Sequence, residues 1–109
     1  MTFRYKLYTH DNSFIEETDA IPLNFTGIAT YISGSKHWFV DGKKHRVGGP
    51  ASEYADGSKD WYNHGNLHRL DGPAVEYTDD SKCWFIDGKE ITELEHKLLI
   101  DIMKLKGLL

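Results

Sequence analysis

Two His-Arg pairs are the residues of this sequence that best suit ligand chemistry. His45-Arg46 and His68-Arg69 each precede a Gly-Pro-Ala segment, in the stretches GKKHRVGGPASEY and GNLHRLDGPAVEY. An arginine guanidinium presents a planar fork of donors that matches a phosphate or carboxylate, and histidine adds a donor near neutral pH. Both pairs are therefore candidate sites for an anionic ligand or a protein partner.

The two stretches belong to a tandem repeat whose copies follow one another at a constant spacing. The third copy loses the His-Arg pair, because Ile91 and Thr92 take the two places. A worn partial copy before the first one stays open, since Tyr8 precedes Tyr31 by one full period. Identical residues recur without a gap at five positions of the three copies: Trp38, Trp61, Trp84; Tyr31, Tyr54, Tyr77; Ser35, Ser58, Ser81; Lys36, Lys59, Lys82; Gly42, Gly65, Gly88.

A structural role for the His-Arg pairs is the alternative to ligand binding. The arginines would pair with a carboxylate on the next strand, such as Glu53 or Glu76, and the histidines would bond to a turn carbonyl. Recurrence in both full copies favours this role, because repeated units must hold one another together.

Each copy predicts short antiparallel strands joined by tight turns. Asp56-Gly57 is a two-residue hairpin signal, since both central positions of such a turn favour positive φ. His64-Gly65 marks a second turn, and Pro73 marks a loop because proline cannot donate to a strand ladder. The predicted fold is mainly β with a C-terminal α-helix, an antiparallel meander built from tandem 23-residue repeats that stack to share a core.

The end of the chain has helical character. Thr92 and Glu95 form a capping box, which predicts a helix from residue 93 to about 106 with Gly107 as its stop. This helix would cap the last copy, form a dimer contact, or do both. Its apolar residues recur at helical spacing, with Leu99 and Met103 widening the stripe: Leu94, Leu98, Ile102, Leu105 and Leu109.

We expect a single domain over residues 1–109. It divides into an N-terminal segment (1–28), three β repeats of which the last is incomplete (29–92), and a capping amphipathic helix (93–109). The segment 1–28 includes the possible degenerate copy.

The stretch WYNHGNLHRLDGPAVEY resembles a short tandem repeat of the form W-Y-x-N-G-x-x-H-R-x-D-G-P-A. This repeat occurs in proteins of bacteriophages, large DNA viruses and some bacteria, and its period is similar to that of MORN-type hairpin repeats. The resemblance covers roughly residues 29 to 92. The first copy departs from it at Val47-Gly48. It implies a phage or mobile-element origin and brings no single activity with it.

Each tryptophan of the repeat is followed by a second large aromatic residue, so every copy carries an aromatic side chain on both faces of its sheet. One helix covers one face, and the other would be covered by a partner, a second copy or a ligand, unless the chain's own loops cover both. The candidate ligand- or partner-binding residues are His45, Arg46, His68, Arg69, Trp38, Trp61, Trp84 and Tyr62.

Composition narrows the function further. A net charge of -4 and a pI near 5.8 argue against a general nucleic-acid binder. One cysteine excludes an internal disulfide and fits a reducing cytoplasm, and no apolar run is long enough for a membrane span. Cys83 occupies a position that varies among the copies, and no metal spacing or glycine-rich phosphate loop stands out. We expect no catalysis, cofactor or metal.

These observations predict a non-catalytic binding protein that is homo-oligomeric and acts as a phage accessory or counter-defence factor. It would bind a host defence protein or sequester a small anionic, nucleotide-like signal. The alternative is a structural or assembly module without a small ligand.

Overall fold

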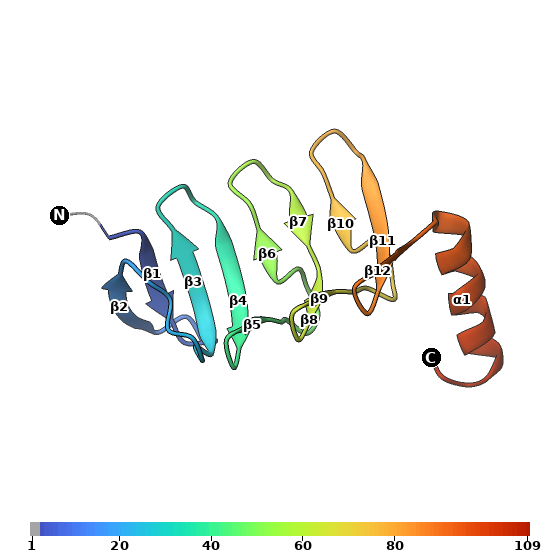
Figure 1. Cartoon of the computed structure of the whole chain (residues 1–109), viewed down its shortest axis with the longest axis horizontal. Coiled ribbons are helices and arrows are strands. Elements are labelled where there is room, and N and C mark those ends of the chain that lie inside the picture. Colours follow the sequence, from blue (N-terminus) through green and yellow to red (C-terminus); the bar gives the residue numbers. More distant parts are fainter. Residues whose placement is uncertain (1–2) are drawn as a thin grey trace.

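A computed structural model describes residues 3–109 as an elongated row of β-hairpins with a helix at one end (Figure 1). The molecule measures 54 × 30 × 20 Å along its principal axes. The predicted antiparallel β meander with a C-terminal helix is confirmed. Within these residues, no helix has the length and apolar character that crossing a bilayer requires.

The elements are, in chain order, β1 (Tyr5–Tyr8), β2 (Phe14–Thr18), β3 (Gly27–Tyr31), β4 (Lys36–Val40), β5 (Lys43–Lys44), β6 (Ser52–Glu53), β7 (Lys59–Asp60), β8 (Tyr62–Asn63), β9 (Asn66–Leu67), β10 (Val75–Glu76), β11 (Lys82–Ile86), β12 (Lys89–Ile91) and α1 (Glu93–Leu105).

The main sheet has the strand order β12-β11-β10-β7-β6-β4-β3-β1-β2, with β5 paired to β4, while β8 and β9 form a separate pair. The hairpins β3–β4, β6–β7 and β10–β11 stand side by side in this sheet. Each hairpin closes with the same backbone hydrogen bond at the equivalent position of its copy: Tyr31 N to Ser35 O at 2.7 Å, Tyr54 N to Ser58 O at 2.9 Å, and Tyr77 N to Ser81 O at 2.9 Å.

The first turn of each copy differs from the prediction. Because Tyr54 bonds to Ser58, three residues form the loop, and Gly57 takes the positive φ of 96°. Such loops combine a type I turn with a glycine bulge. In this loop, Asp56 Oδ1 accepts the backbone N–H of Ser58 at 2.8 Å. The second turn matches its prediction, since His64 and Gly65 both have positive φ.

The N-terminal hairpin joins the sheet in reverse order. Its turn bond from Thr9 N to Ser13 O, at 2.8 Å, matches those of the later hairpins. Elsewhere the second strand of one hairpin pairs with the first strand of the next, as β4 does with β6. Here β1 pairs with β3, and β2 forms the sheet edge. Descent of residues 1–28 from a fourth copy stays a prediction.

Strand register defines two rows of side chains, because directly opposed residues of antiparallel strands share a face. One row alternates lysine and glutamate and lies on the face that carries the tryptophans, here called the tryptophan face. The recurring lysines therefore face glutamates on neighbouring strands, an arrangement that stabilises a sheet. The members of this row are Lys36, Glu53, Lys59, Glu76 and Lys82.

The other row runs along the opposite face: Leu7, Ala29, His37, Ser52, Asp60, Val75 and Cys83. Near the N-terminus the segment 19–26 folds over this face. Its Phe25 joins a buried cluster with Leu7 and Ala29, and lies 6.0 Å, centroid to centroid, from the ring of Phe39.

The covering segment is anchored by the turn between β4 and β5, which gives the first prediction. Gly42 donates its N–H to Phe25 O at 2.9 Å, and a Cβ on Gly42 would lie 1.8 Å from the carbonyl oxygen of Leu23. We expect Gly42→Ala to lower the free energy of unfolding by about 3 kcal/mol, as the clash expels the segment. Urea denaturation measures this loss.

Gly48→Ala is the matched control. Gly48 also has a positive φ, 84°, but a Cβ there meets nothing within 4 Å. Backbone strain alone costs about 1 kcal/mol. Equal losses for the two variants would contradict the anchoring role of Gly42.

Candidate functional site

Each arginine of the His-Arg pairs lies over the tryptophan of its own copy. The guanidinium carbon of Arg46 is 3.8 Å from the ring centroid of Trp38, and that of Arg69 is 3.8 Å from Trp61. Each Nη1 also donates to a proline carbonyl four residues later, at 3.1 Å in both copies: Pro50 for Arg46 and Pro73 for Arg69. The arginine thus joins the indole to the Gly-Pro-Ala loop.

A glycine makes room for this arrangement. A Cβ on Gly72 would lie 2.8 Å from the guanidinium carbon of Arg69, so a larger residue would push the guanidinium off the indole. Carboxylates lie beside both guanidiniums, as the structural alternative predicts. Arg69 lies 3.0 Å from Glu76 and 2.9 Å from Asp71. Arg46 lies 3.8 Å from Glu53. These guanidiniums are engaged within the chain.

The histidines connect neighbouring copies, in a way that differs from the sequence expectation. The ring Nδ1 of His45 accepts the backbone N–H of His64 at 3.0 Å, and Nδ1 of His68 accepts that of Asp87 at 3.0 Å. The expected bond to a turn carbonyl is wrong, because the nitrogen accepts rather than donates. An accepting Nδ1 requires a neutral ring with its proton on Nε2.

Trp84 belongs to the copy that lacks the arginine, and α1 lies beside it. His96 of α1 is buried, and its Nε2 lies 2.9 Å from the carbonyl oxygen of Arg69. Trp84, Ile100 and Lys97 line a groove between the helix and the sheet. The capping box of Thr92 and Glu95 is present as predicted.

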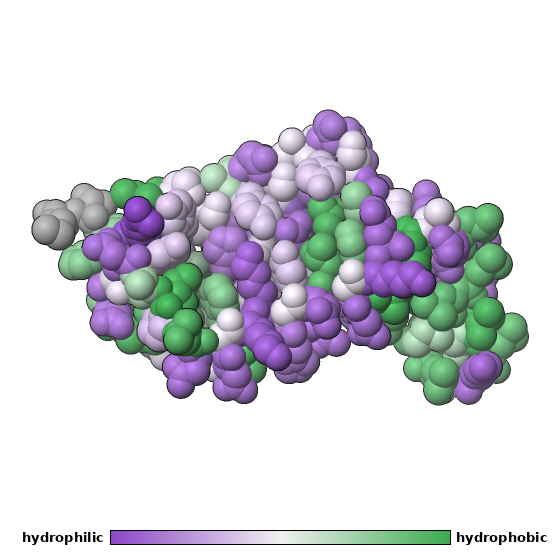
Figure 2. All heavy atoms as spheres, viewed as in Figure 1, coloured by the Kyte–Doolittle hydropathy of each residue, from purple (hydrophilic) through white to green (hydrophobic). Residues whose placement is uncertain are grey.

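Most of the predicted apolar stripe of α1 does not pack on the sheet. His96, which bonds to the carbonyl of Arg69, is buried, and Leu99 and Met103 are half-buried. The rest of the stripe points to solvent. Figure 2 shows hydrophobic residues gathered over the helix end of the molecule. The exposed fractions are Leu94 64%, Leu98 52%, Ile102 49%, Leu105 87% and Leu109 56%.

Half-buried polar groups gather at the middle of the opposite face. His37 Nδ1 lies 2.8 Å from the Ser52 hydroxyl, and the Tyr54 hydroxyl donates to Asp60 Oδ2 at 2.9 Å. Next to them, Lys44 extends along the same face, and its Nζ is 5.3 Å from the ring centroid of Tyr62.

Burial dominates the electrostatics of these groups. It lowers the pKa of His37 to about 4, with a further lowering from the charge of Lys44. It also lowers the pKa of Lys44 itself and raises that of Asp60. The pKa of Tyr54 rises to about 12 through burial and its bond to Asp60. The histidine is therefore neutral at pH 7, and the phenol keeps its proton.

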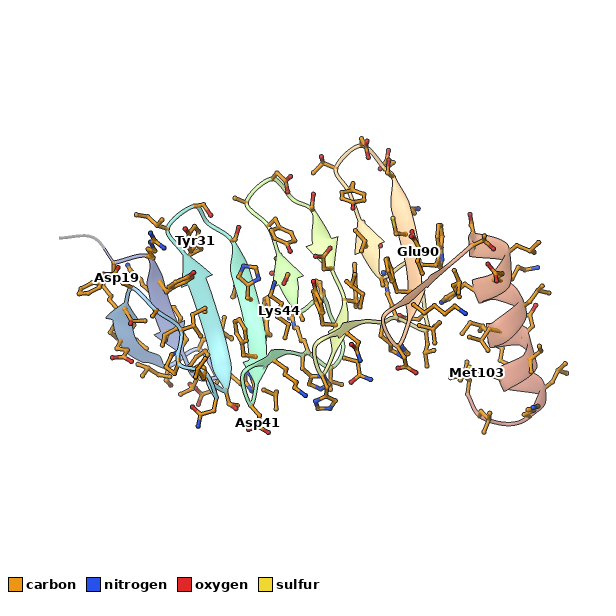
Figure 3. The ribbon with its side chains drawn as sticks, in the orientation of Figure 1. Asp19, Tyr31, Asp41, Lys44, Glu90 and Met103 are labelled. Atoms are coloured by element: carbon orange, nitrogen blue, oxygen red, sulfur yellow. The ribbon has the colours of Figure 1, made fainter. Side chains whose placement is uncertain are left out.

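Beside this cluster lies an open groove of about 660 Å³, which crosses β7, β10 and β11. Val75 and Leu67 contribute apolar surface, and the lining includes aromatic side chains and carboxylates. Figure 3 labels Glu90, which lines this groove, and Lys44, which lies on the same face near β6. The aromatic and acidic lining residues are Tyr54, Tyr77, Phe85, Asp56, Asp60 and Glu90. Within residues 3–109, no basic side chain lines this groove.

Besides Tyr54 and Tyr77, which recur in all three copies, the groove contains positions at which the copies differ. Asp60 corresponds to His37 and Cys83, and Glu90 corresponds to Lys44 and Leu67. Other identical positions, such as Trp38 and Trp61, carry contacts that hold each copy together. The identical residues alone do not reveal the groove. The sequence does carry a signal for the groove. The positions that differ among the copies alternate with others along the strands, and they lie on the face away from the tryptophans.

The sequence-predicted site residues do not form one site. Arg46 with Trp38 and Arg69 with Trp61 form two stacks on the tryptophan face, and His45, His68 and Trp84 lie at the junctions beyond them. Tyr62 lies on the opposite face beside Lys44. In the described part of the chain, no cluster of three His, Cys, Asp or Glu residues is arranged to hold a metal ion.

Comparison with known proteins gave no match: no family model fits the chain, and no curated protein or solved structure is significantly similar to it.

The stacked arginines give the second prediction. Arg69→Lys keeps the charge but loses the planar stack on Trp61 and the fork of donors. We expect it to lower the free energy of unfolding by about 1–3 kcal/mol in urea denaturation. Arg4→Lys, at an exposed arginine, is the matched control and should change stability little. Similar values for the two variants would refute the role of the stack.

The histidines give the third prediction. The pKa of His37 in the folded chain, about 4, and that of His45, lowered by burial and by His64, both lie below the unfolded value near 6.5. Both rings therefore stabilise the fold fully above pH 6.5. This contribution is lost as pH falls below 6.5, down to about 4 in the case of His37. Each contributes a slope below about 1.4 kcal/mol per pH unit, because solvent screens half-buried groups.

Denaturation between pH 7.5 and 4.5 tests this pH dependence. His37→Leu should make the decline shallower, and the His45 contribution should remain. An unchanged slope in His37→Leu would show that the pKa of His37 is the same in the folded and unfolded chains.

Proposed function

We propose that this chain is a non-catalytic binding protein, and that its groove on the opposite face binds a basic side chain of a partner protein. The observation that carries the proposal is the groove lining, where aromatic rings and the carboxylates of Asp56, Asp60 and Glu90 surround one open space. Asp60 and Glu90 stand where the other copies have different residues, so the repeat itself does not require these two carboxylates.

The chemistry of the groove matches an arginine or lysine side chain. Aromatic faces attract a guanidinium or ammonium group, and the apolar stem of such a side chain packs on apolar surface. A carboxylate at the end of the groove then binds the charged head through a charge-assisted hydrogen bond. Phe85, Val75 and Glu90 offer these three elements in one groove.

A small anionic, nucleotide-like ligand has less support. The carboxylates of the groove repel it, and the guanidiniums of Arg46 and Arg69 are already stacked and paired. The resemblance to phage repeat proteins favours a host protein, such as a defence factor, as the partner.

Cys83 supports a binding role rather than nucleophilic catalysis. Burial and the carboxylate of Glu90 raise the pKa of its thiol. A thiol attacks as its thiolate, and a raised pKa keeps it protonated at pH 7.

A structural or assembly module is the second candidate. The exposed stripe of α1 favours it, since self-association through this stripe would need neither a ligand nor a host target.

Charge reversal at Glu90 tests the proposal. Affinity capture from a host lysate, quantified by mass spectrometry, compares the wild type with Glu90→Lys and with Glu16→Lys. Both glutamates are exposed, and Glu16 lies on the distant strand β2. We expect Glu90→Lys to weaken capture of the specific partner at least tenfold, because like charges then meet in the groove. Glu16→Lys should bind as the wild type does.

Capture that survives Glu90→Lys would rule out the groove as the site. Native mass spectrometry of the purified chain examines the anionic alternative, since a retained mass of a few hundred daltons would favour a small ligand.

A further inference from the structure

We propose that two copies of this chain pair through α1 in an antiparallel arrangement. The pairing surface is the helix stripe, defined as Leu94, Leu98, Ile102 and Leu105. Each of these side chains is between 49% and 87% exposed. Contiguous apolar surface of this kind on a soluble chain marks an interaction site.

The stripe is free because another side of the helix packs on the sheet. His96 is buried, and Ile100 lines the groove beside Trp84. Positions two apart on an α-helix lie on nearly opposite sides of it, so Leu98 points away from both of these residues. The side that holds the helix to its own chain is thus opposite the side that would hold the second copy.

The stripe is complementary to itself when two helices run antiparallel. A two-fold axis near residues 99 and 100 brings Leu94 of one copy to the level of Leu105 of the second. The same axis brings Leu98 to the level of Ile102 of the second copy. Isologous pairing of this kind is the commonest form of homodimer contact. The two helix dipoles are also opposed.

The charges beside the stripe agree with the same axis. Asp101 and Lys97 lie on one flank of the stripe. In the dimer, Asp101 of each copy lies near the level of Lys97 of the other copy. On the other flank, Glu95 lies near the level of Lys106 of the second copy. Each flank therefore places a carboxylate near an ammonium group, which favours this register over a parallel one.

The helix charges also select a protein partner over a lipid surface. Residues 93–106 contain three acidic residues and three lysines, so the helix has no net charge. Helices that bind anionic membranes have lysine and arginine on the polar face, whereas Glu95 and Asp101 flank this stripe.

The interface is small. Thirteen residues give a helix about 20 Å long, so the buried area falls at the low end for specific interfaces. We expect a dimer with a dissociation constant on the order of micromolar. The groove on the opposite face of the sheet stays open in this dimer, so the inference stands independently of the proposed function.

Sedimentation velocity on the full chain, from about 1 µM to about 1 mM, tests the pairing. The mass should rise from 12.5 kDa to about twice that value. Leu98→Glu should remain a monomer with unchanged helix content, since Leu98 is exposed in the monomer. A monomer at all concentrations, or a dimer that tolerates Leu98→Glu, overturns the proposal.

A charge swap tests the antiparallel register. Asp101→Lys alone should weaken the dimer several-fold, and Asp101→Lys combined with Lys97→Asp should restore it. Failure of the double variant to recover would contradict this register. Binding of the monomer to phosphatidylserine vesicles without dimer formation would show that the stripe serves a lipid surface instead.

Discussion

The stack of arginine on tryptophan is the interaction on which the rest of the array depends. Strands of two residues, such as β6 and β10, bury too little surface to be stable alone. Arg46 and Arg69 join three separate parts of each copy: the indole, the proline carbonyl and a glutamate on the next strand. A flat guanidinium meets all three at once, which an apolar side chain cannot do. The chain thus forms a β array with a small hydrophobic core.

Much of the fold was predictable because tight turns and helix caps depend on residues close in sequence. The positive φ values of His64 and Gly65 and the capping box of Thr92 are local properties, and the structure has both. The reversed N-terminal hairpin was not predictable, because local sequence does not determine which edge of a hairpin meets the sheet. The side of α1 that packs on the sheet depends on long-range contacts, such as the bond from His96 to the carbonyl of Arg69.

The candidate site was harder to find than the fold. Its residues come from different copies: Asp60 and Glu90 line one groove although they lie far apart in the chain. The repeat period by itself draws attention to the positions that are identical in every copy. In this molecule, identical positions such as Trp38 and Trp61 carry contacts that hold each copy together. The prediction of an aromatic residue on each face was sound, and Arg46 and Arg69 cover two of the tryptophans.

Contacts between copies reach no further than the adjacent copy. His45 bonds to the turn of the following copy, and His68 does the same one unit later. Removing or adding one interior unit would therefore leave each of these histidine bonds with an equivalent backbone partner. A gene with such a repeat could change length by unequal recombination and keep these bonds between copies. The reversed hairpin and α1 fix the two ends, so growth is confined to the interior, and each added unit lengthens the open face by one more set of variable residues.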